Sequence, residues 1–560
     1  MTSDKENISL LADIFIKKGL TDIVISPGSR NAPIILSFAN RAGINAFSIV
    51  DERSAAFFAL GLALNSKKTV AIACTSGSAV LNYASAISEA YYQKIPLLVL
   101  TADRPPHLID VADGQTIRQK NIYNNFIKKS YQLPVLLNTK EKLRATEELI
   151  NEAINNCLFP EPGPVHINIP FDEPIYGTTD EQISGKVIKF ENKLPIIAET
   201  QIQEIATKWN SSNKVLIIAG QAPQNKVVIN LLEKISKNNN TVILTETTSN
   251  LHNTSFIDTI DNVVSTIDKN EIIDFKPEIL ITFGGQVVSK MIKKYLRNNK
   301  PDIHWHISPS GEKLDTYFSL TDVIVSDKVD FFNLIISHLA HTTSNYKSIW
   351  NKRKKNIDIK KENYLSKIDY SDLKVIDTIL KNIPKDTILH LGNSTPVRYS
   401  QLFGSAKGVV YNSNRGVSGI DGQVSTAAGF AFNSDKLNIL ITGDLGFLYD
   451  SNGLMHKYLK PNLKIIVINN SGGGIFKFIP GPDTTPNLEE FFVAKHNWKA
   501  EYICKAFDVN YSKALNIDDL TSILPEFLNM EKQTAGVFEI FTPSDKNAEV
   551  LREYFKYIKI

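Results

Sequence analysis

The sequence predicts an α/β protein with three doubly wound parallel-sheet domains, the first and third of them related by an internal repeat. Short β-branched runs alternate with helical segments along nearly all 560 residues, and each run ends in Gly, Ser, Asn or Asp before a helix. Continuous apolar runs of this kind are typical of parallel strands covered on both faces. The predicted strands lie at 22–27, 69–76, 96–102, 165–170, 214–220, 241–246, 278–285, 302–308, 387–392, 438–444 and 465–472.

Two polar segments divide this pattern into three parts. Residues 177–195 and 340–372 are rich in charged side chains and show little hydrophobic periodicity, so we interpret both as linkers. The domains predicted on either side of them span residues 1–178, 190–342 and 370–560.

The internal repeat appears when the sequence is displaced by 368 positions. "ALNSKKTVAIACTSG" (63–77) then aligns with "AFNSDKLNILITGDL" (431–445), and Gly61 falls on Gly429. The register continues through helix, strand, helix and strand without a gap, which favours duplication. We therefore expect the third domain to share the fold of the first.

Composition excludes several classes of function. A formal charge of +3 gives no electrostatic case for nucleic-acid binding. Three widely spaced cysteines (Cys74, Cys157, Cys504) exclude a disulfide framework and a zinc ribbon, and favour a reducing cytoplasm. The N-terminus lacks the layout of a signal peptide, and no apolar run approaches the ~18 residues that a membrane span needs. We expect a cytoplasmic protein.

The stretch "VDERSAAFFALGLA" (50–63) predicts a helix without a polar face. Every residue from Ala55 to Ala63 is apolar or glycine, so this helix belongs inside a core. Two acids, Asp51 and Glu52, stand at its first turn. They are either favourable charges at a helix start or acids that serve the interior, and the pattern alone leaves both readings open.

Polar residues at two strand ends of the third domain predict a metal–diphosphate site. Gly443-Asp444 ends one strand, and Asn470 with the glycines of "NNSGGGIF" ends the next one along the chain. Open α/β sheets bind ligands at this edge, and Mg²⁺ takes one or two protein oxygens together with phosphate oxygens. The competing interpretation is that Asp444 only caps a helix and the glycines only make a turn.

The Gly-Asp and Asn-Asn pair resembles the diphosphate-binding motif of the thiamine diphosphate enzymes. The resemblance implies aminopyrimidine-binding, central and diphosphate-binding domains, with the coenzyme held between subunits and Mg²⁺, or Mn²⁺, as the metal. It implies that Glu52 hydrogen-bonds the aminopyrimidine and promotes the tautomer that removes the thiazolium C2 proton. The implied metal ligands are Asp444, Asn470 and Gly472, and the further coenzyme contacts are Gly77, Ile420, Gly443, Leu445, Ile475 and Phe476. Leu445 departs from the second glycine that most of these enzymes have after Gly-Asp.

Seven motifs in order are similar to those of one branch of this family, the carboligases of menaquinone biosynthesis. They are "ISPGSRNAPI", "DERSAAFFALGLA", "LTADRPPHL", "GQTI", "GNSTPVR", "SNRGVSGIDG" and "NNSGGGIF", between about residues 8 and 480. The branch decarboxylates 2-oxoglutarate and adds the product to isochorismate. Both substrates are dianions, which arginine grips bidentately. The implied substrate-binding residues are Ser29, Arg30, Arg104, Gln115, Lys290, Arg398, Arg415, Ile475 and Phe476.

Two alternatives remain at this point. One is another 2-oxo acid decarboxylase or an acetohydroxyacid synthase, although the chain lacks the adjacent histidines that such decarboxylases often use. The other is a non-catalytic nucleotide-binding protein, although the dinucleotide fingerprint is missing. Coenzyme sites shared between subunits imply self-association, a dimer at least and a tetramer by family resemblance.

Overall fold

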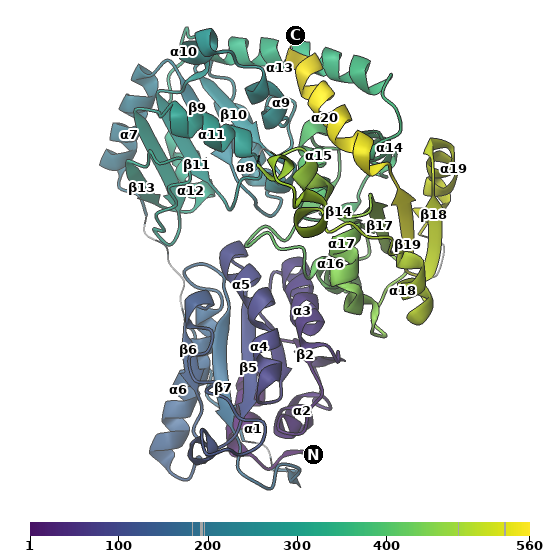
Figure 1. Cartoon of the computed structure of the whole chain (residues 1–560). Coiled ribbons are helices and arrows are strands. Elements are labelled where there is room, and N and C mark those ends of the chain that lie inside the picture. Colours follow the sequence, from purple (N-terminus) through teal and green to yellow (C-terminus); the bar gives the residue numbers. More distant parts are fainter. Residues whose placement is uncertain (182, 191–193, 195, 480, 531–533, 560) are drawn as a thin grey trace. The chain divides into compact units, whose positions relative to one another are not determined.

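The computed structural model describes residues 1–559 except 182, 191–193, 195, 480 and 531–533. It contains three parallel sheets flanked by helices (Figure 1), as the sequence predicts. Five positions of the expected linker at 177–195 lie outside the described residues. No helix of the described part of the chain has the length and apolar character needed to cross a membrane.

The first and third sheets have the same strand order, which is the fold relation that the repeat predicts. Each has six strands, in the orders β3-β2-β4-β5-β7-β6 and β15-β14-β16-β17-β19-β18. The first sheet consists of β2 (Asp22–Ile25), β3 (Asn45–Ser48), β4 (Val70–Cys74), β5 (Leu97–Asp103), β6 (Ser130–Gln132) and β7 (Val165–Pro170). The third consists of β14 (Ile388–Leu391), β15 (Val410–Asn412), β16 (Asn438–Gly443), β17 (Leu463–Asn469), β18 (Asn510–Ala514) and β19 (Gly536–Phe541).

The middle sheet has five parallel strands in the order β10-β9-β11-β12-β13. These are β9 (Val215–Ala219), β10 (Thr241–Thr245), β11 (Ile279–Phe283), β12 (Ile303–Ser308) and β13 (Asp322–Val325). A short antiparallel pair, β1 (Thr2–Ser3) with β8 (Thr178–Thr179), closes the N-terminus onto the end of the first domain.

Some of the helices that accompany the sheets begin after an N-cap residue whose side chain accepts from a backbone N–H group of the first turn. Those before the middle sheet are α1 (Glu6–Lys17), α2 (Ala32–Phe38), α3 (Glu52–Ser66), α4 (Ser78–Asn82), α5 (Ala84–Gln93) and α6 (Lys140–Asn156). Those around the middle sheet are α7 (Glu199–Ser211), α8 (Lys226–Ile235), α9 (Ile260–Ser265), α10 (Ile272–Phe275), α11 (Lys290–Asn298), α12 (Lys328–Ile336) and α13 (Tyr346–Leu365). The remainder are α14 (Asp372–Asn382), α15 (Thr395–Phe403), α16 (Gln423–Phe432), α17 (Asp444–Tyr449), α18 (Ala500–Ala506), α19 (Ile517–Phe527) and α20 (Ser544–Lys559).

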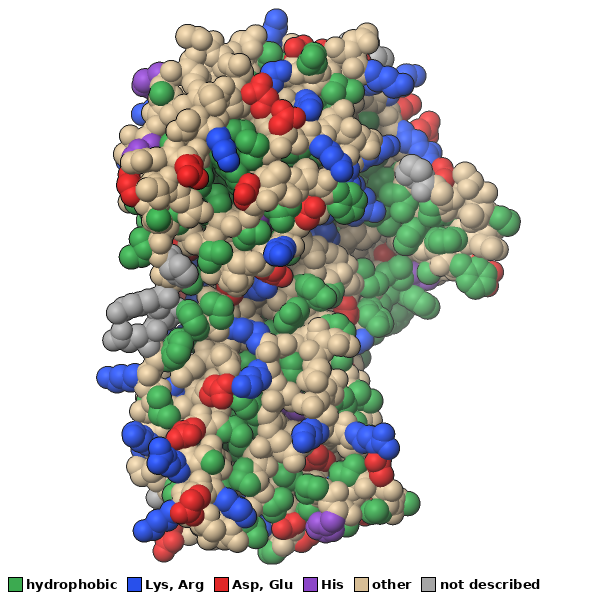
Figure 2. All heavy atoms as spheres, turned by 90° about the vertical axis from the view of Figure 1, so that its left-hand side faces the viewer, with side chains coloured by type: hydrophobic (Ala, Val, Ile, Leu, Met, Phe, Trp, Pro, Cys, Tyr) green, Lys and Arg blue, Asp and Glu red, His purple; other side chains and the backbone are tan. Residues whose placement is uncertain are grey.

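The chain divides into two compact units, which are described separately below. The first comprises Met1–Asn192, Asn414–Asp435 and Leu448–Leu463, and the second the remaining segments, including the middle and third sheets. Figure 2 shows Lys and Arg side chains interspersed with Asp and Glu over the face that it draws, in keeping with the low net charge.

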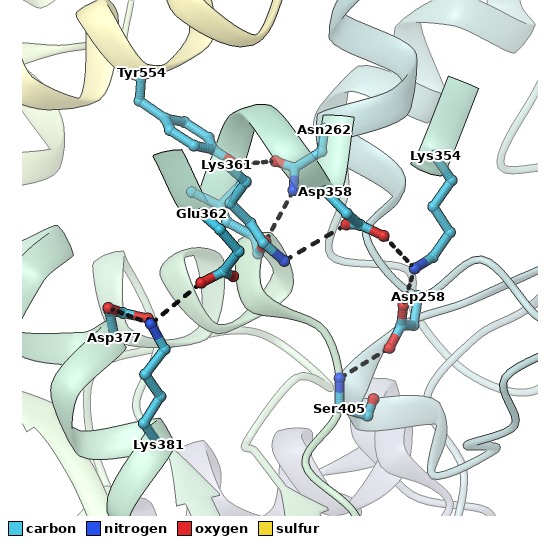
Figure 3. A network of polar contacts seen from close by, with 11 residues as sticks. Asp258, Asn262, Lys354, Asp358, Lys361, Glu362, Asp377, Lys381, Ser405 and Tyr554 are labelled. Atoms are coloured by element: carbon cyan, nitrogen blue, oxygen red, sulfur yellow. Dashed lines mark hydrogen bonds and ion pairs between the residues drawn. The ribbon is translucent and has the colours of Figure 1, made fainter. Parts of the chain in front are cut away.

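Residues 340–372, expected to be a linker, contain the 20-residue helix α13. The linker interpretation was wrong. The helix is hard to recognise in the sequence because its buried residues stand among many charged ones; they are Tyr346, Trp350, Ile357, Lys361 and Leu365. All of these except Lys361 join a core cluster that includes residues of both the middle and third sheets. Figure 3 shows the polar side of the same packing: Lys354 Nζ lies 2.9 Å from Asp358 Oδ2, and Tyr554 donates to Asn262 Oδ1 at 2.9 Å.

Within the first unit, α3 and α16 cross through equivalent glycines of the repeat. A Cβ atom on Gly61 would lie 2.1 Å from the carbonyl oxygen of Thr426, and one on Gly429 would lie 2.0 Å from that of Phe58. Gly61 and Gly429 are equivalent under the displacement of 368 positions, and so are Phe58 and Thr426. The two helices therefore approach backbone to backbone about a local pseudo-twofold axis, which explains why α3 needs no polar face.

Gly429→Ala is expected to lower the free energy of unfolding by about 1–3 kcal/mol, because the added methyl group would force the backbones of α3 and α16 apart. The loss is expected although Ala favours a helix over Gly by about 1 kcal/mol. Thermal unfolding without ligand measures it. Gly114→Ala is the matched control, since a Cβ there meets no atom within 4 Å. Equal melting temperatures for the two variants would contradict the tight crossing.

Candidate active site

The candidate residues fall into two groups, one in each compact unit. The first unit contains Ser29, Arg30, Glu52, Gly77, Arg104, Gln115, Arg415 and Ile420. The second contains Lys290, Arg398, Gly443, Asp444, Leu445, Asn470, Gly472, Ile475 and Phe476.

The two acids at the start of α3 have different environments. Asp51 is the N-cap: its Oδ1 accepts from the Ser54 amide at 2.9 Å, and its Oδ2 accepts from Asn452 Nδ2 at 2.7 Å. Glu52 is half-buried, and its carboxylate makes no hydrogen bond with another described residue. Its charge contributes, after burial, to raising the pKa of the Cys74 thiol at the end of β4. Helix capping therefore explains Asp51 and leaves Glu52 without a structural task.

Gly77 and Gln115 lie together at the same end of the first sheet. A Cβ atom on Gly77 would lie 3.0 Å from Gln115 Cγ, and Ser76 Oγ donates to the Gln115 carbonyl at 2.9 Å. Gln115 itself has φ = 59°, an uncommon value for a residue with a side chain. Buried Gln119, which sequence reasoning missed, accepts from the Gly77 amide at 3.0 Å.

Two candidate arginines of the first unit are placed by acidic neighbours. Arg30 is buried, 2.8 Å from Glu173 Oε1, and its charge opposes the burial-driven rise in the pKa of Asp103. The Arg104 amide donates to Asp103 Oδ1 at 2.8 Å, and its guanidinium lies 3.7 Å from Asp113. Ser29 is exposed, and its side chain makes no hydrogen bond with the other described candidate residues.

Buried Glu89 holds the loop that carries Arg415 and Ile420. Its carboxylate accepts from the amides of Gly416 and Val417 at 2.6 and 2.8 Å. Burial raises the pKa of Glu89, while these amides act against the rise. Arg415 is itself buried, whereas Ile420 is exposed and accessible to a ligand.

In the second unit, Asp444, Asn470 and Gly472 come together at the carboxyl ends of β16 and β17. Asp444 is buried; its Oδ2 accepts from the Gly472 amide at 2.8 Å and its Oδ1 from the Leu445 amide at 2.7 Å. Gly472 has φ = 141°, and a Cβ there would lie 2.4 Å from the Val493 carbonyl, so only glycine fits. The Asn470 Oδ1 atom is buried and makes no hydrogen bond with any described residue.

These residues fit a small divalent cation. Among the described residues no cluster of three or more His, Cys, Asp or Glu side chains could hold a metal. Asp444, Asn470 and Gly472 offer a different set of ligands: one carboxylate, one amide oxygen and one main-chain carbonyl oxygen. This set suits Mg²⁺ when phosphate oxygens and water complete its coordination shell. A buried amide oxygen without a donor is costly unless a ligand satisfies it.

Sequence reasoning missed two residues that border this cluster. Asp372 accepts from Asn470 Nδ2 at 2.8 Å, and burial, with the Asp444 charge as a lesser contribution, raises its pKa to about 6. His496 Nδ1 accepts from the Trp498 amide at 3.1 Å, and its Nε2 lies 3.3 Å from Asp444 Oδ2. Asp372 stood in the supposed linker, and His496 lies beyond the last motif.

The expected hydrophobic wall follows directly after Gly472. Ile475 is buried within the 3₁₀ turn Gly474–Lys477, and the ring of Phe476 packs against Phe492 at 5.8 Å between centroids. Gly443, the last residue of β16, has no atom within 4 Å of a Cβ built on it. Open space therefore remains beside the predicted diphosphate site.

Two acids of the second unit, buried Glu246 and half-buried Asp261, lie near the start of α11 and near Arg398. Glu246 accepts from the amides of Val288 and Ser289, both at 2.7 Å, directly before Lys290 begins α11. The charges of Asp261 and Glu246 oppose the burial that lowers the pKa of Arg398. Burial raises the pKa of Glu246 to about 7. Ser394, which precedes α15 and hence Arg398, has φ = 76°, a strained conformation that clusters at functional sites.

Comparison with known proteins agrees with this architecture. Residues 8–125 match the family model "Thiamine pyrophosphate enzyme, N-terminal TPP binding domain", and residues 190–391 match "Middle domain of thiamine pyrophosphate". Proteins named 2-succinyl-5-enolpyruvyl-6-hydroxy-3-cyclohexene-1-carboxylate synthase are similar over nearly the whole chain. That of Flavobacterium johnsoniae is 42% identical, covering 98% of both chains. That of Christiangramia forsetii is 43% identical, covering 97% of both. That of Porphyromonas gingivalis is 40% identical, covering 99% of this chain and 98% of its own.

The similarity therefore extends beyond residue 480 and through the central domain, where the motifs were sparse. The three sheets, the matched thiamine pyrophosphate models and relatives of this identity lead to one assignment. The chain belongs to the thiamine pyrophosphate enzymes and, among them, to the 2-succinyl-5-enolpyruvyl-6-hydroxy-3-cyclohexene-1-carboxylate synthase family.

Proposed function

We propose that this chain is a thiamine diphosphate- and Mg²⁺-dependent transferase. It decarboxylates 2-oxoglutarate and joins the remaining four-carbon unit to isochorismate by 1,4-addition, which gives 2-succinyl-5-enolpyruvyl-6-hydroxy-3-cyclohexene-1-carboxylate and CO₂. The observation that carries the proposal is the oxygen-only cluster of Asp444, Asn470 and Gly472, with its unpaired amide oxygen, in a chain that aligns end to end with synthases of this name.

Each group of residues has a defined task in this proposal. Asp444, Asn470 and Gly472 would hold the metal and, through it, the diphosphate. Glu52 would share a proton with the aminopyrimidine ring, a role that Asp51 cannot take because its carboxylate is occupied by the helix cap. Bound there, the coenzyme supplies the electron sink that decarboxylation of a 2-oxo acid requires.

The arginines would clamp the carboxylates of both substrates. Each 2-oxoglutarate and isochorismate molecule carries two negative charges, and bidentate guanidinium–carboxylate pairs fix position as well as charge. Hydrogen bonds to the main chain support this role. Glu89 accepts from the amides that follow Arg415, and Glu246 accepts from the amides that precede Lys290. Ile420, Ile475 and Phe476 would supply the apolar wall against the thiazolium ring.

Arg415→Ala is expected to raise KM for one or both substrates by about ten- to hundred-fold, because a lost charged hydrogen bond costs about 1.5–3 kcal/mol. Arg398→Lys is the corresponding change at the second arginine, since it removes the planar fork yet keeps a charge beside Asp261 and Glu246. Steady-state kinetics with each substrate varied in turn measures both. Arg144→Ala, on an 81% exposed side chain, is the control. Wild-type KM values in both variants would contradict the clamp.

The reaction itself is tested by product analysis. Protein, thiamine diphosphate, Mg²⁺, 2-oxoglutarate and isochorismate are combined, and the product is identified by mass spectrometry. The proposal requires a compound with the mass of both substrates minus CO₂. Free succinic semialdehyde without the adduct would favour a simple decarboxylase, and acetolactate formed from pyruvate would favour an acetohydroxyacid synthase.

We further propose that the chain self-associates and that each active site takes Glu52 from one subunit and Asp444 from another. Family resemblance supports this arrangement. Glu52→Gln and Asp444→Ala, each inactive alone, are co-expressed with different affinity tags, and the mixed dimers are isolated. One site of each mixed dimer then pairs an intact Glu52 with an intact Asp444, so activity is expected to return to about half of wild type. Mixed dimers as inactive as their parents would show that both residues of a site come from one chain.

A further inference from the structure

The amide of Asn470 has two ends of similar shape and opposite function. Only its Oδ1 atom can bind a cation, because the Nδ2 group carries two hydrogens and no lone pair for a metal. The side chain is buried, Nδ2 donates to Asp372 Oδ2 at 2.8 Å, and Oδ1 has no partner among the described residues. One specific contact therefore fixes which end of the amide is free.

Asp372 is itself held by several groups. It opens α14 after the N-cap Ser371 and is 2% exposed. Its Oδ1 accepts from Thr542 Oγ1 at 2.6 Å, at the end of β19, and its own amide donates to Asn547 Oδ1 at 2.8 Å, on α20. Thr542 and Asn547, 170 and 175 positions further along the chain, thus fix Asp372 beside Asn470.

This arrangement discriminates between the two orientations of the amide. An ionised carboxylate only accepts hydrogen bonds. Rotating the Asn470 amide by half a turn would place Oδ1 against Asp372 Oδ2 and leave the buried Nδ2 group turned toward the cation site. The rotated amide would lose a charge-assisted hydrogen bond and would place two hydrogen-bond acceptors, Oδ1 and the Asp372 carboxylate, against each other.

We propose that Asp372 is the positioning residue of the metal site, which locks the Asn470 amide with its carbonyl oxygen facing the cation. This inference rests on the proposed metal site. Partners of this kind, which orient a metal ligand without touching the metal, typically change metal affinity by about 10–100-fold when they are removed.

The neighbouring residue provides an internal control. Asn469 Nδ2 donates to a second buried carboxylate, Glu539 Oε1, at 2.7 Å. Glu539 also accepts from the Ala500 amide at 3.0 Å and from the Tyr511 hydroxyl at 2.7 Å. Unlike Asn470 Oδ1, Asn469 Oδ1 is occupied, because it accepts from the Ser471 amide at 3.0 Å. Glu539 therefore has the same chemistry as Asp372 without the same consequence for a metal.

The test measures the Mg²⁺ concentration that gives half of the maximal rise in melting temperature at saturating thiamine diphosphate. Asp372→Ala is expected to raise this concentration about ten- to hundred-fold. Asp372→Asn is expected to restore it to near the wild-type value, because the new amide oxygen can accept from Asn470 while its NH₂ group donates to Thr542 Oγ1. Glu539→Ala is expected to lower the melting temperature without ligand but to leave the Mg²⁺ requirement unchanged.

Two results would overturn the proposal: an unchanged Mg²⁺ requirement in Asp372→Ala, or an equal increase in Glu539→Ala. If Asp372→Ala does not fold, Asp372→Ser takes its place, since its short hydroxyl keeps a polar group at the helix start but does not reach Asn470. Asp444→Ala separates this proposal from the one on which it rests. A wild-type Mg²⁺ response in Asp444→Ala would remove the metal site, whereas its loss there with no change in Asp372→Ala would remove only the positioning role.

Discussion

Glu52→Gln is expected to slow the exchange of the C2 proton of bound thiamine diphosphate for deuterium by at least about a hundred-fold, the range in which a positioned acid or base contributes. Glutamine keeps the shape of the side chain and one hydrogen bond but offers no ionisable oxygen. Coenzyme binding should persist, since the metal site is intact, and the coenzyme-induced rise in melting temperature checks this. The exchange rate is read by quenching in acid followed by NMR of the released coenzyme.

Asp51→Asn is the matched control for this prediction. The two acids are adjacent, but Asp51 caps α3 and contacts Asn452. Asparagine is an equally good N-cap residue, and its NH₂ group can donate to the Asn452 amide oxygen once that amide turns over. Stability and C2 exchange should therefore both stay close to wild type. Wild-type exchange in Glu52→Gln would reduce Glu52 to a favourable charge at a helix start. Equal losses in both variants would point to disruption of the helix rather than to proton transfer.

Asp444→Ala is expected to abolish the rise in melting temperature that Mg²⁺ and thiamine diphosphate together produce. A ligand present at about 100 times its Kd stabilises the folded state by about 2.7 kcal/mol, and the variant should forfeit that entire gain. It removes the one carboxylate of the proposed ligand set and leaves the Gly472 amide without its acceptor. The melting temperature without ligand should therefore fall as well, which is why the difference with and without ligand is measured.

Asp386→Ala is the control for Asp444→Ala, because this carboxylate is 84% exposed. It should respond to Mg²⁺ and thiamine diphosphate like the wild type. A normal response in Asp444→Ala would mean that the diphosphate binds elsewhere. The alternative interpretation of Asp444 as a helix cap would then stand, since the residue does begin α17.

The fold could be predicted from sequence because parallel strands buried on both faces leave an unmistakable pattern. The repeat was visible because Gly61 and Gly429 occupy equivalent places in one crossing, where no other residue fits. The linker at 340–372 was misjudged for a physical reason. The buried residues of α13 follow helical spacing, but one of them is Lys361, while Ile359 is exposed among the charged residues, so the amphipathic pattern is weak.

The sequence motifs point only to residues that we propose to contact the ligands directly. Asp372, Glu89 and Glu246 act on other residues, through an amide group or through backbone N–H groups. A single carboxylate at a helix start or within a helix carries no sign of the distant segment that it contacts. Such partners become visible only when the strand ends and loops are placed in space.

The crossing of α3 and α16 has a consequence for protein engineering. By sequence α16 belongs to the third domain, yet it is part of the first compact unit, where Gly422 of its N-cap lies against the Phe57 ring and Phe432 packs near Phe58. A fragment excised at residues 1–192 would therefore expose the apolar surface of α3 to water. A truncated first domain would need the segments Asn414–Asp435 and Leu448–Leu463, supplied on the same chain or in trans, to bury that surface.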